Sequence, residues 1–133
     1  MEIIQDTAVK FTVPEHLVDR ITENIPKSEV VEYRKGLAEL MVYWGAAEMT
    51  RLNQLLSFRN PLPSPITRDY DWPGLYKPFA HQRTTAEFLS IQHRAFCFNE
   101  AGTGKTSSVI WAADYLMTQG LVRRVLVICP LSI

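Results

Sequence analysis

Residues 99–106, "NEAGTGKT", combine two glycines, a lysine and a threonine in an order that suits the binding of a nucleotide's phosphates. Phosphate is held best by backbone N–H groups that point into one concavity at the start of a helix, and glycines let the backbone approach it closely. Gly102 and Gly104 supply that freedom. The residues expected to line this site are Ala101, Gly102, Thr103, Gly104, Lys105, Thr106 and Ser107.

Lys105 and Thr106 are the candidate catalytic residues of this loop. The lysine ammonium suits the β and γ phosphates, and the threonine hydroxyl suits Mg²⁺. Asn99 stands where the general pattern G-x-x-x-x-G-K-[ST] has its first glycine. A structural alternative therefore stays open, in which the loop is a glycine-containing turn that caps a helix and Lys105 is solvated.

The loop lies between segments that we expect to be regular. We predict helices over residues 81–94 and 105–119, and short buried strands over residues 95–98, "AFCF", and 124–129, "RVLVIC". Continuous apolar strands separated by a helix favour a parallel sheet with helices on both faces. Residues 79–133 are thus predicted to begin an α/β domain. The expected buried face of its longer helix comprises Val109, Ala112, Ala113, Leu116 and Met117.

The first 60 residues read as a small α+β accessory domain. Strands are predicted over 8–13 and 38–44, and helices over 15–25 and 46–58, which gives a β-α-β-α order. Five of the eight prolines fall within the next segment, residues 61–78, and predict a connector without a long helix or central strand. Its aromatics, Tyr70, Trp72 and Tyr76, are expected to cover a surface of the protein.

Composition places few further limits on the function. Fourteen Lys and Arg residues balance fourteen Asp and Glu residues, so the overall charge indicates no nucleic-acid partner. No apolar run approaches the ~20 residues that cross a bilayer, and the first residues lack a secretion signal, so we expect no membrane partner and a cytoplasmic location. Cys97 and Cys129 are expected to be reduced and buried, and no metal-ligand cluster is indicated.

Three motifs together resemble those of superfamily 2 helicases. "NEAGTGKT" is similar to the first ATPase motif of Swi/Snf-type DNA translocases, commonly Asp-Glu-Met-Gly-Leu-Gly-Lys-Thr, with Asn99 in place of the aspartate. "YKPFAHQRTTAEFL" resembles the Q motif, whose matching glutamine, Gln82, would meet the edge of adenine. Phe79 occupies the place of the family's usual arginine. "VLVICPLSI" resembles motif Ia, in which Ser132 would contact a DNA phosphate.

The resemblance implies a RecA-like ATP-binding domain, with ATP and Mg²⁺ as cofactors and DNA as partner. The chain also looks like the N-terminal part of phage-encoded DNA helicases, which would place it in the bacterial host cytoplasm. Hydrolysis in this family needs an acidic pair and arginines from a second lobe. Neither is present in residues 1–133, so we expect these residues to bind nucleotide but to leave hydrolysis to a longer enzyme, an ATP-dependent DNA translocase.

Two other readings remain open. One is a different P-loop enzyme, such as a small kinase or a GTP-binding switch. The other is a non-enzymatic binding module in which the N-terminal unit acts and residues 99–106 are a remnant.

Overall fold

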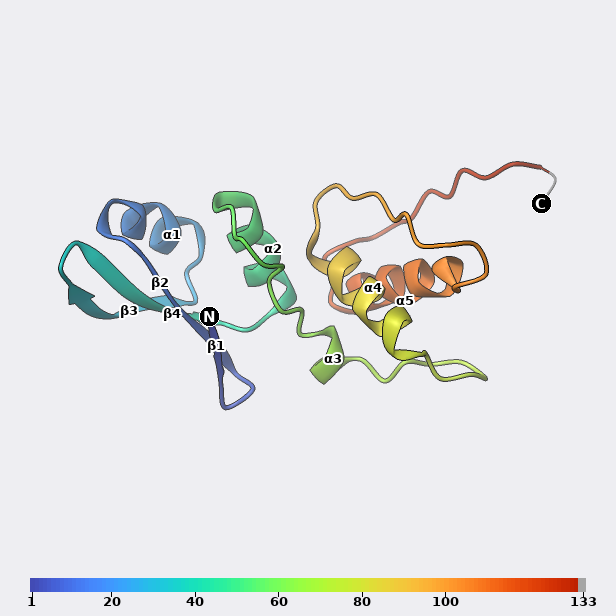
Figure 1. Cartoon of the computed structure of the whole chain (residues 1–133), viewed down its shortest axis with the longest axis horizontal. Helices are drawn as coiled ribbons and strands as arrows, with labels where there is room; N and C mark the ends of the chain where they lie inside the picture. The colour runs from blue at the N-terminus through green and yellow to red at the C-terminus, as the bar shows by residue number, and fades with distance from the viewer. Residues whose placement is uncertain (132–133) are drawn as a thin grey trace.

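The computed structural model describes residues 1–131 as an elongated molecule with a sheet at one end and two packed helices at the other (Figure 1). The strands are β1 (Glu2–Ile4), β2 (Ala8–Pro14), β3 (Ser28–Arg34) and β4 (Leu37–Tyr43). The helices are α1 (Val18–Asn24), preceded by the 3-10 turn η1 (Glu15–Leu17), then α2 (Ala46–Leu55), α3 (Ile66–Asp69), α4 (Ala80–Ile91) and α5 (Lys105–Thr118).

The four strands form one antiparallel sheet in the order β1-β2-β4-β3. Val9 faces Val42 and Phe11 faces Leu40 across the β2–β4 pair. Because side chains alternate along a strand, these apolar residues share one buried face. Buried residues of α1 and α2 join that face in the first hydrophobic core, among them Ile21, Met49 and Leu52.

Two hairpins of this sheet went unrecognised in the β-α-β-α prediction, which lacked β1 and β3. The β3–β4 turn is made by Lys35 and Gly36, both with positive φ, 51° and 79°, as in the type I′ turns common in two-residue hairpins. β3 is an edge strand with an irregular register between Val30 and Glu32, and most of its side chains are exposed. Because charged residues occupy much of β3, its sequence lacks the alternation of apolar and polar residues by which a strand is predicted.

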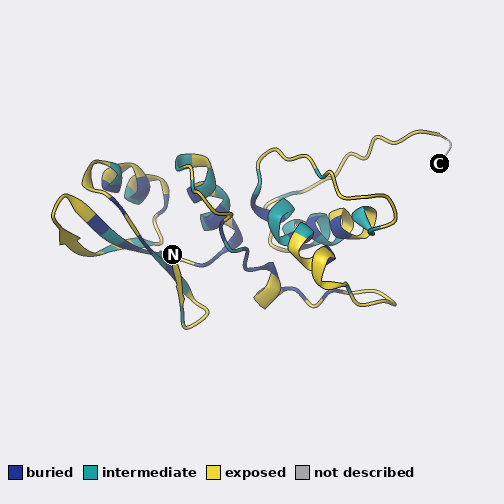
Figure 2. Ribbon diagram, viewed as in Figure 1, coloured by how far each residue is buried: buried dark blue, intermediate teal, exposed yellow. Residues whose placement is uncertain are grey.

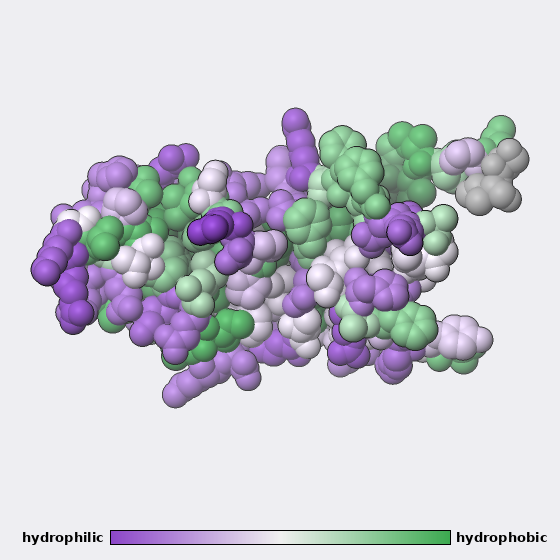
Figure 3. All heavy atoms as spheres, in the orientation of Figure 1, coloured by the Kyte–Doolittle hydropathy of each residue, from purple (hydrophilic) through white to green (hydrophobic). Residues whose placement is uncertain are grey.

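The predicted parallel, RecA-like sheet is wrong. Within residues 1–131 every strand belongs to the antiparallel sheet, and residues 95–98 and 124–129 are irregular chain. Phe98 is 89% exposed and Ile128 is 88% exposed. A buried strand needs neighbours for its hydrogen bonds and cover for both faces, and these two segments have neither. Apolar side chains gather at this end of the molecular surface in Figure 3.

A second hydrophobic core joins the connector to α4 and α5 (Figure 2). Tyr70 and Trp72 are buried there, whereas Tyr76 is 79% exposed. The buried stripe of α5 is Ser108, Ala112 and Tyr115. The predicted stripe was therefore wrong at Val109 and Met117, which are exposed, because α5 contacts α4 and the connector instead of a sheet.

Further contacts join the two parts of the chain. Ile91, at the end of α4, is buried in the first core, and Ala46, at the start of α2, is buried in the second. Trp44 Nε1 donates a hydrogen bond to the carbonyl of Pro63, 3.0 Å away. Among residues 1–131, no helix has the length and apolarity needed to cross a bilayer.

The two cysteines are less buried than predicted. Cys97 is half-buried and Cys129 is exposed, and neither forms a disulfide with the other. Both lie in the irregular segments that were expected to be strands. Their exposure has the same cause as that of the neighbouring apolar residues, namely the absence of a covering sheet.

Candidate phosphate-binding loop

The candidate loop, residues 99–106, follows irregular chain and leads directly into α5. Gly102 and Gly104 have φ values of 75° and 74°, in the left-handed region that favours glycine. Gly104 is the N-cap of α5 and is also crowded: an added Cβ there would overlap Nε2 of Gln82 and lie 3.1 Å from its Cδ. At Gly102 no heavy atom lies within 4 Å of the same position.

The first turn of α5 offers free hydrogen-bond donors. Within residues 1–131, the backbone N–H groups of Gly104, Lys105, Thr106 and Ser107 donate to no other protein group. The first N–H groups of any helix lack partners inside it and carry the positive end of its dipole. No acidic residue lies in this turn, and Thr106 and Ser107 are exposed. These donors therefore fit a phosphate group.

The ammonium of Lys105 lies at the same loop. Its Nζ donates to the carbonyl oxygens of Asn99 and Glu100, each 2.8 Å away. The hydroxyl of Thr103 donates to the same carbonyl of Glu100 at 2.7 Å. These bonds close residues 99–105 into a compact turn. To bind an anion beside the loop, the Lys105 ammonium would exchange the two carbonyl oxygens for oxygens of the anion.

Gln82 fixes the loop to α4. Its side chain is buried, with Oε1 accepting the N–H of Phe79 at 2.9 Å and Nε2 donating to the carbonyl of Gly104 at 3.4 Å. Both ends of the amide predicted to meet adenine are thus engaged by the protein's own backbone. In this arrangement Gln82 holds two parts of the site together, the start of α4 and the start of α5.

An aromatic cleft adjoins the loop, and two of its lining residues, Gln82 and Ser107, were predicted to bind the nucleotide although the cleft itself was not predicted. This cleft, about 420 Å³, is lined by Gly74, Leu75, Tyr76, Lys77, Phe79, Gln82, Ser107 and Trp111. Phe79 is 71% exposed, and Trp111 is oriented by a 3.0 Å hydrogen bond from its Nε1 to the carbonyl of Pro73. Aromatic faces of this kind are suited to stacking on a planar ring. The sequence feature that could have indicated this cleft is the cluster of aromatic residues within residues 70–79.

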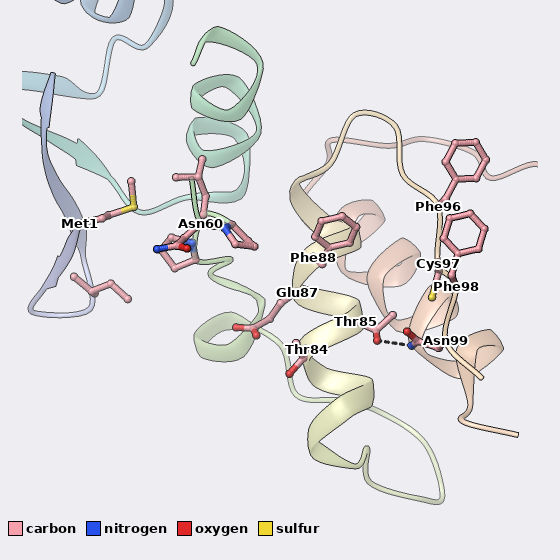
Figure 4. Close-up of a pocket in the computed structure, with 14 residues that line it drawn as sticks. Met1, Asn60, Thr84, Thr85, Glu87, Phe88, Phe96, Cys97, Phe98 and Asn99 are labelled. Atoms are coloured by element: carbon pink, nitrogen blue, oxygen red, sulfur yellow. Dashed lines mark hydrogen bonds between the residues drawn. The ribbon is translucent and has the colours of Figure 1, made fainter. Parts of the chain in front are cut away.

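A larger apolar cleft of about 770 Å³ lies on the other side of α4, between that helix, β1 and residues 96–99 (Figure 4). Thr85 and Asn99 meet at its border, where Asn99 Nδ2 donates to Thr85 Oγ1 at 2.9 Å. Burial raises the pKa of Glu87, which also lines this cleft. Its apolar walls and its carboxylate do not suit a phosphate group.

The other predicted ligands are placed as follows. Thr106 presents an exposed side chain at the first turn of α5, so any Mg²⁺ there would rely on this hydroxyl and on the phosphates themselves. Among residues 1–131, no three His, Cys, Asp or Glu side chains form a metal-binding group. Ser132, the predicted DNA contact, lies outside the described residues.

Comparison with known proteins identified no relative of this chain. No known protein family, curated protein or solved structure matches the chain. The interpretation of the site therefore depends on the geometry of the loop, α4 and α5.

Proposed function

We propose that residues 99–107 bind the triphosphate of ATP together with Mg²⁺, with the base in the adjoining cleft. The observation that carries this proposal is the set of four consecutive free N–H groups from Gly104 to Ser107 beside the Lys105 ammonium. Backbone donors, a helix N-terminus and a lysine converge at one exposed turn. A solvated helix cap needs no such convergence.

Each residue of the site has a distinct role in the proposal. The N–H groups hold phosphate oxygens at the start of α5. The Lys105 ammonium leaves the carbonyls of Asn99 and Glu100 and neutralises charge on the outer phosphates. The Thr106 hydroxyl serves as a ligand to the metal. When bound, ATP supplies the phosphoanhydride bond whose hydrolysis can drive a motor.

The aromatic cleft supplies the second contact. Phe79 and Trp111 both line this cleft together with Ser107, which also belongs to the first turn of α5. Stacking of a base on an aromatic ring contributes about 1–3 kcal/mol per base where this has been measured by alanine substitution. Gln82 acts in this scheme through Gly104, and contacts the base only if its amide is released from Phe79.

The finer proposal is that this nucleotide site serves an ATP-dependent DNA helicase or translocase. Its support is the sequence resemblance of the loop, of the Q motif around Gln82 and of residues 125–133. Movement along DNA would require residues that orient water and stabilise the developing charge. The site described here would then bind the fuel of that motor.

Titration calorimetry with MgATP and MgGTP tests the nucleotide proposal. We expect Lys105→Ala to weaken MgATP binding about 10- to 100-fold, because a charge-assisted hydrogen bond is worth about 1.5–3 kcal/mol. Arg20→Ala removes the same charge from α1, in the sheet-bearing part of the chain, and serves as the matched control. Equal affinity of Lys105→Ala and Arg20→Ala, or no binding of MgATP by the wild type, would contradict the proposal and favour a binding module.

A further inference from the structure

Two neighbouring residues at the start of α4 hold two successive carbonyls of the candidate loop. His81 Nε2–H donates to the carbonyl oxygen of Thr103 at 2.9 Å, and Gln82 Nε2 donates to that of Gly104 at 3.4 Å. We infer that His81 is a positioning residue that orients the Thr103–Gly104 peptide, so that the Gly104 N–H faces the anion. This inference rests on the proposed phosphate site.

The geometry of the peptide group explains how a bond to one atom aims another. In a trans peptide the C=O and the following N–H point in opposite directions, and the structure has no cis peptide among the described residues. A carbonyl of Thr103 drawn toward α4 therefore turns the N–H of Gly104 away from α4. Like the N–H groups of Lys105 and Thr106, which follow it in the chain, this N–H has no backbone acceptor within residues 1–131.

The glycine makes such an anchor necessary. Rotation of the Thr103–Gly104 peptide changes φ of Gly104, and glycine accepts positive and negative φ almost equally. The residue that shapes the loop therefore offers little resistance to a flip that would point a carbonyl at the phosphate. A hydrogen bond from outside the loop is a direct way to select one orientation.

His81 has no substitute in this task. The carbonyl of Gly104 accepts from Gln82 and also from the backbone N–H and the hydroxyl of Ser108, both at 3.2 Å. The carbonyl of Thr103, by contrast, has His81 as its one donor within residues 1–131. Loss of His81 should free this peptide while the next peptide stays fixed.

The imidazole is itself oriented by the aromatic cleft. Its ring lies parallel to that of Phe79, with centroids 5.8 Å apart and an angle of 14° between the planes. Phe79 lines the aromatic cleft. His81 thus contacts both halves of the proposed site, the aromatic wall on one side and the loop on the other. Because His81 is exposed, water competes for its hydrogen bond and the expected effect is modest.

Three variants separate the roles of this side chain. His81→Phe keeps a flat ring against Phe79 but removes the donor, and His81→Gln restores an N–H donor. His93→Phe is the matched control, because His93 follows the other end of α4 and contacts Gln54 instead of the loop. Two readouts are used: the backbone amide resonance of Gly104 without ligand, and calorimetric binding of Mg²⁺ with inorganic tripolyphosphate, which lacks a base.

We expect His81→Phe to broaden or double the Gly104 resonance and to weaken tripolyphosphate binding about fivefold, while His81→Gln recovers at least half of that loss. His93→Phe should match the wild type in both measurements. Unchanged Gly104 resonance and affinity in His81→Phe would overturn the inference, while the phosphate site would stand if Lys105→Ala still lost binding. A wild type that binds no tripolyphosphate, with a doubled Gly104 resonance in His81→Phe, would leave the orientation of the peptide supported and the proposed function rejected.

Discussion

Replacing Gly104 by alanine should damage the site through two separable effects. The first is conformational, because φ at this position is 74°. A side chain in the left-handed region costs about 1–2 kcal/mol. The second is a clash, because the new Cβ would overlap Nε2 of Gln82 and force its buried amide to move. Movement of that amide breaks its bonds to Phe79 and to residue 104 itself.

The two effects predict different magnitudes at the two loop glycines. Each hydrogen bond of Gln82 contributes about 1 kcal/mol, so Gly104→Ala should lower the free energy of unfolding by about 2–4 kcal/mol when the conformational cost is added. Gly102→Ala has a similar φ of 75° but no neighbour within 4 Å of the new Cβ. It should cost only the conformational part, about 1–2 kcal/mol.

Urea unfolding followed by circular dichroism measures these differences. The double variant Gly104→Ala with Gln82→Ala removes the clash, so the two substitutions should cost less together than the sum of their separate effects. Equal costs for Gly102→Ala and Gly104→Ala, or strict additivity with Gln82→Ala, would refute the claim that Gln82 packs against the α5 N-cap.

Three further predictions concern other parts of the chain. Leu126→Lys should change the free energy of unfolding by less than about 0.5 kcal/mol in urea, because Leu126 is 85% exposed, whereas a buried strand at this position would be strongly destabilised by the charge. Burial and the 2.5 Å hydrogen bond to Asp114 raise the pKa of Tyr70 above its ordinary value of 10.0, so its stabilisation is complete below pH 10 and is lost as the pH rises through the folded-state pKa. Tyr70→Phe should therefore melt at a lower temperature at pH 7 and lose less than the wild type above pH 10. Burial raises the pKa of Glu87 above 4.5, which favours its neutral form in the fold, so Glu87→Gln should raise the melting temperature at pH 7 and lose that advantage below about pH 4.5.

Within residues 1–131, local signals predicted four of the five α-helices, all but α3, and two of the four strands. The predicted helix over 105–119 corresponds to α5 (Lys105–Thr118), and that over 81–94 to α4 (Ala80–Ile91). The strands predicted over 8–13 and 38–44 are β2 and β4, the two central and most buried strands of the sheet. Alternation of apolar residues is strongest where one face is buried, so edge strands give the weakest signal.

The error in the second half has a different origin. "AFCF" and "RVLVIC" are short apolar runs, and such a run indicates only that burial of its side chains would be favourable. Whether it becomes a strand depends on partners that are distant in sequence, and no local pattern contains that information. In this structure the two segments do not pair, and Phe96 and Phe98 instead stack on each other with centroids 5.7 Å apart.

The geometry of the loop does not depend on the two wrongly predicted strands, because it is set by short-range contacts with α4 and α5. Left-handed glycines, free N–H groups and the Lys105 ammonium all arise within seven residues of the α5 N-terminus. The remaining positioning comes from His81 and Gln82 on α4, which contacts α5 directly. The conformation of the loop is thus held by α4 and α5, with irregular chain before it. The loop residues can therefore be tested for phosphate binding independently of any assignment of the chain to a motor fold.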